Sequence, residues 1–185
     1  MIEIPLPLMS KLARQGAEIV RAQTTFADVR VDDGVFRIEY EGKQEASLVP
    51  GRVSALRFES EHELLIDYRE PWLDLLLSSA PDAVAEAEHD LVAAVDEIFH
   101  GWRKLRRYAN KVLADVLRDG FGLALRGPGM LALRAEHILA RHGARTQLRP
   151  WPGRAAEEGF SALVADRSFV VAKAFRATSD APVGA

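Results

Sequence analysis

One apolar stripe at helical spacing runs from Pro81 to Arg118 and is the longest regular pattern in the chain. At about 100° per residue, its apolar positions fall within about 60° of one line. They are Leu91, Val95, Ile98, Trp102, Leu105, Ala109, Val112, Leu113 and Val116. A helix with such a stripe must bury it, so the pattern predicts a long central helix over 81–118 that the rest of the chain covers.

The flanking residues predict where this helix begins and ends. Residues Ser79 to Asp82 are typical of a capped start, and Asp119-Gly120 is typical of a helix end in which glycine takes the left-handed conformation. Uninterrupted, the helix would be roughly 55 Å long at about 1.5 Å per residue, which is more than a small domain covers. A bend near Gly101 is therefore expected.

The length and composition indicate one α+β domain over residues 1–185. With 185 residues, of which 48% are hydrophobic, the chain is long enough for one core and short for two. Because the chain has no cysteine, it has no disulfide framework, no thiolate nucleophile and no sulfur-ligated metal. The N-terminus lacks a signal-peptide pattern, and no apolar run approaches the length of about 20 residues that spans a membrane. A cytoplasmic protein without membrane contact is expected.

The net charge of −3 hides an uneven distribution. Residues 1–100 contain 9 Lys and Arg against 20 Asp and Glu, whereas residues 101–154 contain 12 against 3. The basic block 101–154 fits two interpretations. It either attracts an anionic ligand or partner, or it lies against the acidic half of the same chain.

Residues 26–68 show the period-two pattern of an antiparallel meander with one face in contact with solvent. Asp33-Gly34 is the strongest hairpin signal. A two-residue loop there pairs Val31 with Phe36, Val29 with Ile38 and Ala27 with Tyr40, which places these side chains on one face. A preceding helix is expected over Ser10–Ala22, and further strands are expected over 44–49, 52–58 and 63–68.

The C-terminal part predicts a strand–helix–strand unit and a hairpin over residues 121–175. The strands are expected over Phe121–Arg126 and Ala144–Arg149, with a helix over Met130–His142 between them. The hairpin, 160–165 with 168–175, turns at Asp166-Arg167. Residues 176–185 are expected to form a flexible tail. The predicted fold is thus an antiparallel sheet, a meander, packed on a long central helix and extended by these elements.

The sharpest ligand-binding pattern is Gly127-Pro128-Gly129-Met130-Leu131-Ala132, which resembles the G-x-G-x-x-A dinucleotide fingerprint between a strand and a helix. The free N–H groups of a helix N-terminus favour an anion there. However, Arg149 stands near the position where an acid would bind a ribose hydroxyl, and Arg126 precedes the first glycine. A dinucleotide site, a simple anion site and a structural turn remain open. The candidate anion-binding residues are Arg126, Gly127, Gly129 and Arg149.

The metal-binding and nucleic-acid patterns are weaker. His89, Asp96 and His100 share one helical line, but seven residues along a helix is about 10 Å, too far for one ion. No metal site is therefore expected. The basic run from Arg103 to Lys111 includes Trp102, which belongs to the apolar stripe and is expected to be buried, and Tyr108. Because one aromatic side chain then remains for stacking, nucleic acid is not an expected partner.

Two classes of function follow. The first is a non-catalytic ligand-binding or protein-interaction module, whose partner is a small anionic ligand or another protein. The alternative is a small enzyme that binds an anionic substrate or nucleotide cofactor at the Gly127–Gly129 loop, with His100 and Asp96 as acid–base candidates. The motifs identify no particular cofactor, and they do not determine the oligomeric state.

Overall fold

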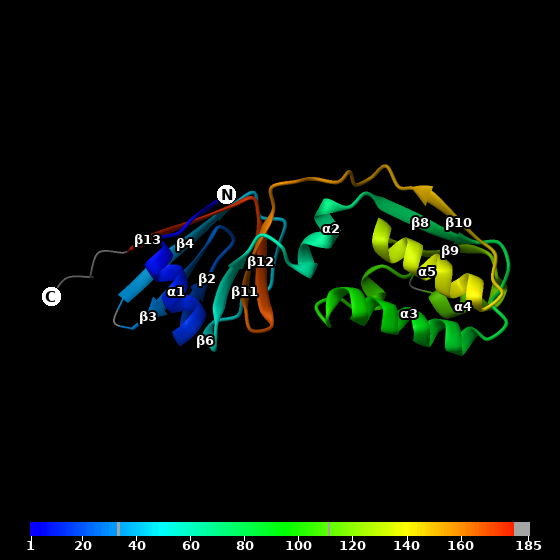
Figure 1. Ribbon diagram of the computed structural model, residues 1–185, viewed down its shortest axis with the longest axis horizontal. Helices are drawn as coiled ribbons and strands as arrows, with labels where there is room; N and C mark the ends of the chain where they lie inside the picture. The colour runs from blue at the N-terminus through cyan, green and yellow to red at the C-terminus, as the bar shows by residue number, and fades with distance from the viewer. Residues whose placement is uncertain (33, 111, 180–185) are drawn as a thin grey trace. The chain divides into compact units, whose positions relative to one another are not determined.

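The computed structural model describes residues 1–32, 34–110 and 112–179, which form two compact units (Figure 1). Unit 1 comprises Met1–Leu65 and Gly159–Ala185, and unit 2 comprises Ile66–Glu158. The described residues form mixed α and β structure with several antiparallel pairings and five α-helices. One core was expected from the length, but each unit has a hydrophobic cluster of its own. None of the described helices is both long enough and apolar enough to cross a bilayer.

Unit 1 contains two sheets and one α-helix. In order, the first sheet is β1 (Ile2–Glu3), β13 (Ala174–Ser179), β4 (Gly34–Glu41), β3 (Phe26–Val31), β2 (Ala17–Ala22) and β6 (Gly51–Val53). The second is β5 (Glu45–Ala46), β12 (Ser168–Ala172), β11 (Ser161–Ala165) and β7 (Leu56–Glu59). The helix α1 (Leu6–Gln15) adds Leu8 and Leu12 to the core of unit 1. Strand alternation buries Ala27, Val29 and Ile38 in the same core.

The expected hairpin is present with a different register. Val31 pairs with Gly34 and Val29 with Phe36, a shift of two residues from the predicted pairing. The φ of Asp32 is 52°, so the left-handed turn conformation begins one residue earlier than predicted. Because strand side chains alternate, a shift of two keeps the predicted residues on the same face. Asp33 of the predicted turn lies outside the described residues, as do residues 180–185 of the predicted tail.

The helix predicted over Ser10–Ala22 is wrong in its second half. The helix α1 ends at Gly16, which has a φ of 74°, and the following residues form β2 between β3 and β6. A Cβ atom on Gly16 would lie 2.4 Å from the carbonyl oxygen of Val53, so the close approach of β6 requires glycine there. The strand predicted over 63–68 is also absent, because these residues form the short helices η1 (Glu63–Leu65) and α2 (Ile66–Arg69).

The closing hairpin of unit 1 is confirmed. Strands β11 and β12 pair antiparallel, with Ala165 opposite Ser168, on either side of Asp166 and Arg167. Asp166 has a φ of 51° and accepts hydrogen bonds from the amide and hydroxyl of Ser54. Residues Ala174–Ser179 form the separate strand β13, which pairs with β4, so the flexible tail predicted from residue 176 is wrong for residues 176–179.

Unit 2 is a three-stranded sheet with helices on one face (Figure 1). Its central strand, β8 (Trp72–Leu77), pairs antiparallel with β9 (Gly122–Pro128) and with β10 (Thr146–Pro150). Strands β9 and β10 are therefore parallel to each other and are joined by α5 (Gly129–Arg141). The predicted strand–helix–strand unit is present, with β8 inserted between its strands.

The long helix predicted over 81–118 is replaced by three shorter elements. They are α3 (Val84–Phe99), η2 (Leu105–Arg107) and α4 (Leu113–Asp119). His100 and Gly101 both take left-handed conformations, with φ of 46° and 80°, which ends α3 more sharply than the expected bend. The first part of the apolar stripe is still buried, with Leu91 and Val95 in the core. Trp102, expected at the centre of that core, is half-buried.

Candidate functional site

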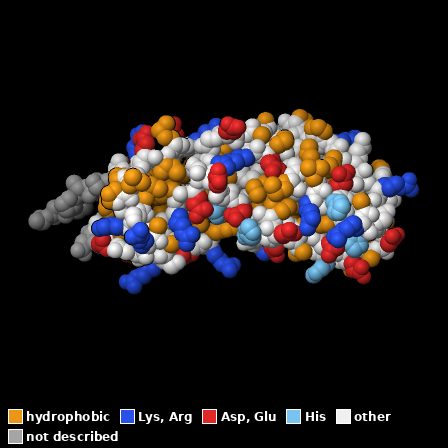
Figure 2. Space-filling view, in the orientation of Figure 1, with side chains coloured by type: hydrophobic (Ala, Val, Ile, Leu, Met, Phe, Trp, Pro, Cys, Tyr) orange, Lys and Arg blue, Asp and Glu red, His pale blue; other side chains and the backbone are white. Residues whose placement is uncertain are grey.

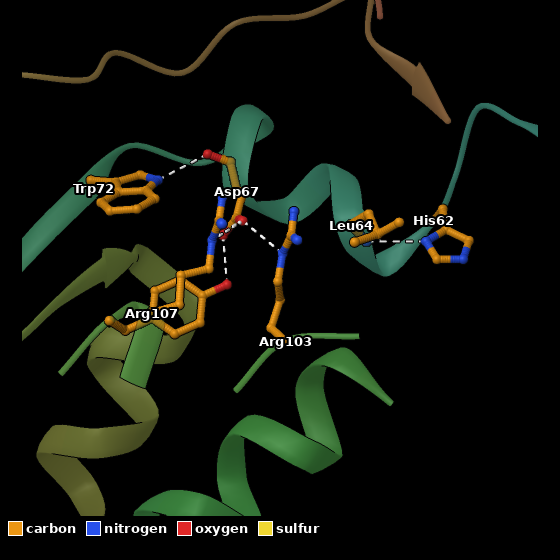
Figure 3. A network of polar contacts seen from close by, with 7 residues as sticks. His62, Leu64, Asp67, Trp72, Arg103 and Arg107 are labelled. Carbon is orange, nitrogen blue, oxygen red and sulfur yellow. Dashed lines mark hydrogen bonds and ion pairs between the residues drawn. The ribbon is translucent and has the colours of Figure 1, made fainter. Parts of the chain in front are cut away.

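A buried polar network surrounds Asp67 in unit 2 (Figure 3). The Asp67 side chain is 0% exposed. Its Oδ2 accepts hydrogen bonds from the Nε atoms of Arg103 and Arg107, each at 3.0 Å, and its Oδ1 accepts one from the Tyr108 hydroxyl at 2.7 Å. The indole of Trp72 donates to the Asp67 main-chain oxygen at 2.9 Å. The network therefore ties α2 to the irregular segment that follows α3.

The geometry of this network suits a structural role. Both carboxylate oxygens of Asp67 are engaged, and the side chain has no solvent-facing surface on which a substrate can bind. Burial, followed by the nearby charge of Asp67, raises the pKa of Tyr108 well above its ordinary value, so this hydroxyl stays protonated. Tyr108, considered above as a stacking group for nucleic acid, is buried against Phe99.

The start of α5 is capped by a side chain of the protein itself. The amide of Met130 donates to Glu70 Oε2 at 2.6 Å, and the amide of Gly129 donates to the Pro71 carbonyl at 3.0 Å. Gly127 lies within β9 rather than in a loop, and a Cβ atom there would meet Tyr108 and Leu131 on the helix side of the sheet. A carboxylate thus occupies the position where the sequence pattern suggested a bound anion.

Arg126 and Arg149, the two candidate arginines, lie on either side of Asp74 across the sheet. Asp74 of β8 is the register partner of both residues. Arg126 donates to the two oxygens of Asp74 at 2.5 and 3.0 Å, and these hydrogen bonds raise the pKa of Arg126. Arg149 donates instead to the amide oxygen of Gln147, at 2.9 and 3.2 Å. The structure thus places Arg126 and Arg149 on one face of the sheet. Gly127 lies near the C-terminal end of β9, and Gly129 is the first residue of α5.

The outer face of the unit 2 sheet, defined as the face opposite α5, carries a row of exposed polar side chains from β10. Strand alternation places Gln147 and Arg149 on this face, and Thr146 and Leu148 on the face of α5. The same alternation, continued one residue beyond each end of β10, places Arg145 and Trp151 on the outer face. In the part of the chain that the structure describes, neither Arg145 nor Arg149 has a carboxylate within ion-pair distance. In the sequence, this row is visible as a period of two over 145–151, of which Arg149 alone was a candidate anion-binding residue.

Aromatic side chains and arginines stack beside this row. The guanidinium of Arg126 lies 4.6 Å from the ring centre of Trp151, and the rings of Trp151 and Trp72 are 5.7 Å apart. Arg154 covers Trp72 at 4.9 Å and Tyr68 at 4.5 Å. These contacts leave Trp151 half-buried and Trp72 buried, so arginine side chains rather than open ring faces dominate the outer face.

The residues considered for metal binding do not form a site. Asp96 pairs with Lys104 at 3.1 Å, and His100 lies at the left-handed end of α3. His89 precedes Asp90, which pairs with His142 at 3.0 Å. Among the residues that the structure describes, no group of three or more His, Asp or Glu side chains is arranged to hold a metal ion.

Several basic residues of the block 101–154 form ion pairs with acidic residues of unit 2. The segment 66–158 contains 13 Lys and Arg and 14 Asp and Glu, so it is close to neutral. Beyond the Asp67 network, the pairs are Lys104–Asp96, Arg118–Asp115, Arg126–Asp74, Arg134–Glu97 and Arg141–Asp90. Figure 2 shows blue and red side chains interspersed on the visible face. Arg145, Arg149 and the exposed Arg106 form no ion pair among the described residues, although Arg149 lies opposite Asp74, which Arg126 engages.

Comparisons of the chain with protein-family models, with curated proteins and with solved structures find no match.

Proposed function

We propose that this protein is a non-catalytic binding module that takes an anionic ligand or protein partner on the outer face of the unit 2 sheet. The observation that carries the proposal is a pair of exposed arginines, Arg149 within β10 and Arg145 directly before it, for which the described residues offer no carboxylate within ion-pair distance. A guanidinium offers several N–H donors to an incoming carboxylate or phosphate, and such charge-assisted hydrogen bonds are the stronger kind.

The surrounding residues support binding more than catalysis. Arg126 is paired with Asp74 and packs on Trp151 beside Arg149. The positive charge that the outer face offers to a ligand therefore comes from Arg145 and Arg149. The enzyme alternative has less support, because Glu70 caps α5 and because Asp96, one of its acid–base candidates, is engaged by Lys104.

The test is an amide chemical-shift titration of the protein with tripolyphosphate at constant ionic strength. Saturable shifts are expected for β10 amides, and the double variant Arg145→Gln, Arg149→Gln should weaken binding by about tenfold or more. Arg118→Gln is the matched control, since Arg118 is an exposed arginine of α4 paired with Asp115. Shifts that centre on the start of α5, or binding that the double variant leaves unchanged, would contradict the proposal.

A further inference from the structure

Strand β10 is an edge strand of the unit 2 sheet. The amide of Trp151 donates to the Trp72 carbonyl, and the amide of Ser78 donates to the Arg145 carbonyl. Main-chain groups alternate in direction along an antiparallel strand, so residues 145, 147, 149 and 151 face β8. The N–H and C=O groups of Thr146 and Leu148 therefore point away from β8. In the sheet that the described residues form, these groups have no neighbouring strand to pair with.

A shallow groove of about 700 Å³ lies beside the start of this edge, on the helix side of the sheet. Thr146 lines it together with the apolar Leu133 and Ala140 and the polar Glu136, His137 and Arg145. Leu133 is 55% exposed, which is a high value for a leucine. An added strand would place every second side chain on this side of the sheet, where Leu133 offers an apolar contact.

On the outer face, the same added strand would meet two cations. Arg149 lies in β10 and Arg145 directly before it, four residues away, with Gln147 between them, and all three are exposed. Residues of an added strand that lie opposite these positions would share their face. Acidic side chains there would meet both guanidinium groups. The edge thus offers hydrogen bonds in its plane, the side chain of Leu133 on the helix side and the positive charge of Arg149 on the outer face.

We propose that the edge of β10 takes an extended acidic peptide segment of a partner protein as a fourth, antiparallel strand. The partner segment alternates acidic residues, opposite Arg145, Gln147 and Arg149, with apolar residues opposite Thr146 and Leu148. This inference rests on the proposed function and names its partner class. Main-chain hydrogen bonds supply the part of the affinity that does not depend on the sequence of the peptide, and the alternating side chains supply specificity. Pro150 lacks an N–H group and ends the row of edge donors.

The probe is an acetylated and amidated five-residue peptide, Glu-Val-Glu-Val-Glu, tested against the full chain by chemical-shift titration. In antiparallel pairing, the valine amides point to β10 and the glutamate amides point to solvent. N-methylation of both valines should weaken binding by about tenfold, because it removes two inter-strand hydrogen bonds. N-methylation of the outer two glutamates should change the affinity by less than about threefold. Equal effects of the two modifications, or the reverse order, would overturn antiparallel edge pairing.

Protein variants complete the test. Arg145→Gln with Arg149→Gln should weaken peptide binding by about tenfold or more, and Arg118→Gln should leave it unchanged. A peptide of the same composition in the order Glu-Glu-Val-Val-Glu should bind much more weakly, because its acids no longer share one face. If tripolyphosphate binds at β10 but the two N-methylated peptides bind equally, only the edge proposal fails. If neither probe shifts β10, the proposed function fails with it.

Discussion

Asp67 is fully buried, whereas aspartate side chains are usually exposed to solvent. A carboxylate without solvent exposure is stable here because Arg103, Arg107 and Tyr108 all donate to it. Arg103 is itself only 5% exposed, so removal of Asp67 would leave a buried cation without this partner. The network is therefore an all-or-none arrangement in which losing one member is costly.

Asp67→Asn should lower the free energy of unfolding of unit 2 by about 3–5 kcal/mol, because it removes the charge that balances two arginines. All three tryptophans of the chain, Trp72, Trp102 and Trp151, lie in unit 2, so urea denaturation followed by tryptophan fluorescence measures this unit. The matched control is Asp115→Asn, which breaks an exposed pair with Arg118 and should cost less than about 1 kcal/mol. Equal effects of the two substitutions would contradict the structural role of Asp67.

Tyr108 gives unit 2 a pH-dependent stability. Its pKa is raised by burial and by Asp67 above the ordinary 10.0, so the folded state holds the phenolic proton more tightly than the unfolded state. The stabilisation is complete below about pH 10 and is lost as the pH rises further. Above about pH 10, the free energy of unfolding should therefore fall by up to about 1.4 kcal/mol per pH unit from this group.

Tyr108→Phe removes the ionisable group, so its unfolding free energy should fall less steeply between about pH 9 and about pH 11 than that of the wild type. The measurement is urea denaturation by tryptophan fluorescence across this range, and the slopes rather than the absolute stabilities are compared. Parallel slopes for the two proteins would show that Tyr108 titrates near its ordinary value.

At this scale, the sequence reveals the exposed residues better than the buried polar ones. The alternation of Arg145, Gln147, Arg149 and Trp151 is visible as a period of two, and it predicts a shared strand face. Nothing near Asp67 indicates that it meets arginines about forty residues later in the chain. That pairing depends on where the chain turns after α3, which local patterns do not specify.

Among the elements, α5 shows how a sequence motif and its structural use differ. The glycine pattern correctly indicated a helix that starts near Gly129, although a Cβ atom there would make only ordinary contacts, 3.6 Å from the Pro71 carbonyl oxygen. It also suggested that the N-terminal amides of α5 are free. Instead, the side chain of Glu70, in the connection between α2 and β8, accepts a hydrogen bond from the Met130 amide. A distant carboxylate thus takes the role that a bound anion takes in the dinucleotide motif.

Glu70→Ala should destabilise unit 2 by about 0.5–2 kcal/mol, since it removes the cap of α5. It should also create a response to anions, so that sulfate raises the midpoint of thermal unfolding of the variant more than that of the wild type at equal ionic strength. Glu136→Ala, within α5 and away from its start, is the control and should show no such gain. An equal sulfate effect on all three proteins would mean that the helix start does not bind anions.

The helix predicted over 81–118 was wrong for a reason that periodicity does not detect. The apolar stripe continues past Phe99, but the chain carrying it reverses at His100 and Gly101 and packs again as η2 and α4. Residues of both parts, such as Leu91 and Leu113, still enter one core. The stripe therefore predicted burial correctly, whereas the continuity of the helix depended on two residues in left-handed conformations.

On the scale of the whole molecule, unit 2 is a continuous segment between the two parts of unit 1. The hairpin of β11 and β12 in unit 1 was predicted from the sequence, whereas β8 of unit 2 and the partners that complete each sheet were not. Strand β7 pairs with β11, more than a hundred residues away, and β8 separates β9 from β10. The hydrophobic periodicity of a segment does not indicate which distant strand it pairs with, so the division into two cores could not be predicted.

The segment Ile66–Glu158, expressed alone, should fold. It has its own hydrophobic cluster, and its ends lie together, because the amide of Glu157 donates to the Tyr68 carbonyl at 2.8 Å. We expect the same tryptophan emission as in the full chain, a cooperative urea transition, and the same affinity for the Glu-Val-Glu-Val-Glu peptide. The Asp67→Asn form of the segment is the matched control, because it should lose the transition or shift it to much lower urea. A segment without a cooperative transition would instead support the single domain predicted from the length of the chain, in which unit 2 depends on unit 1 for its stability.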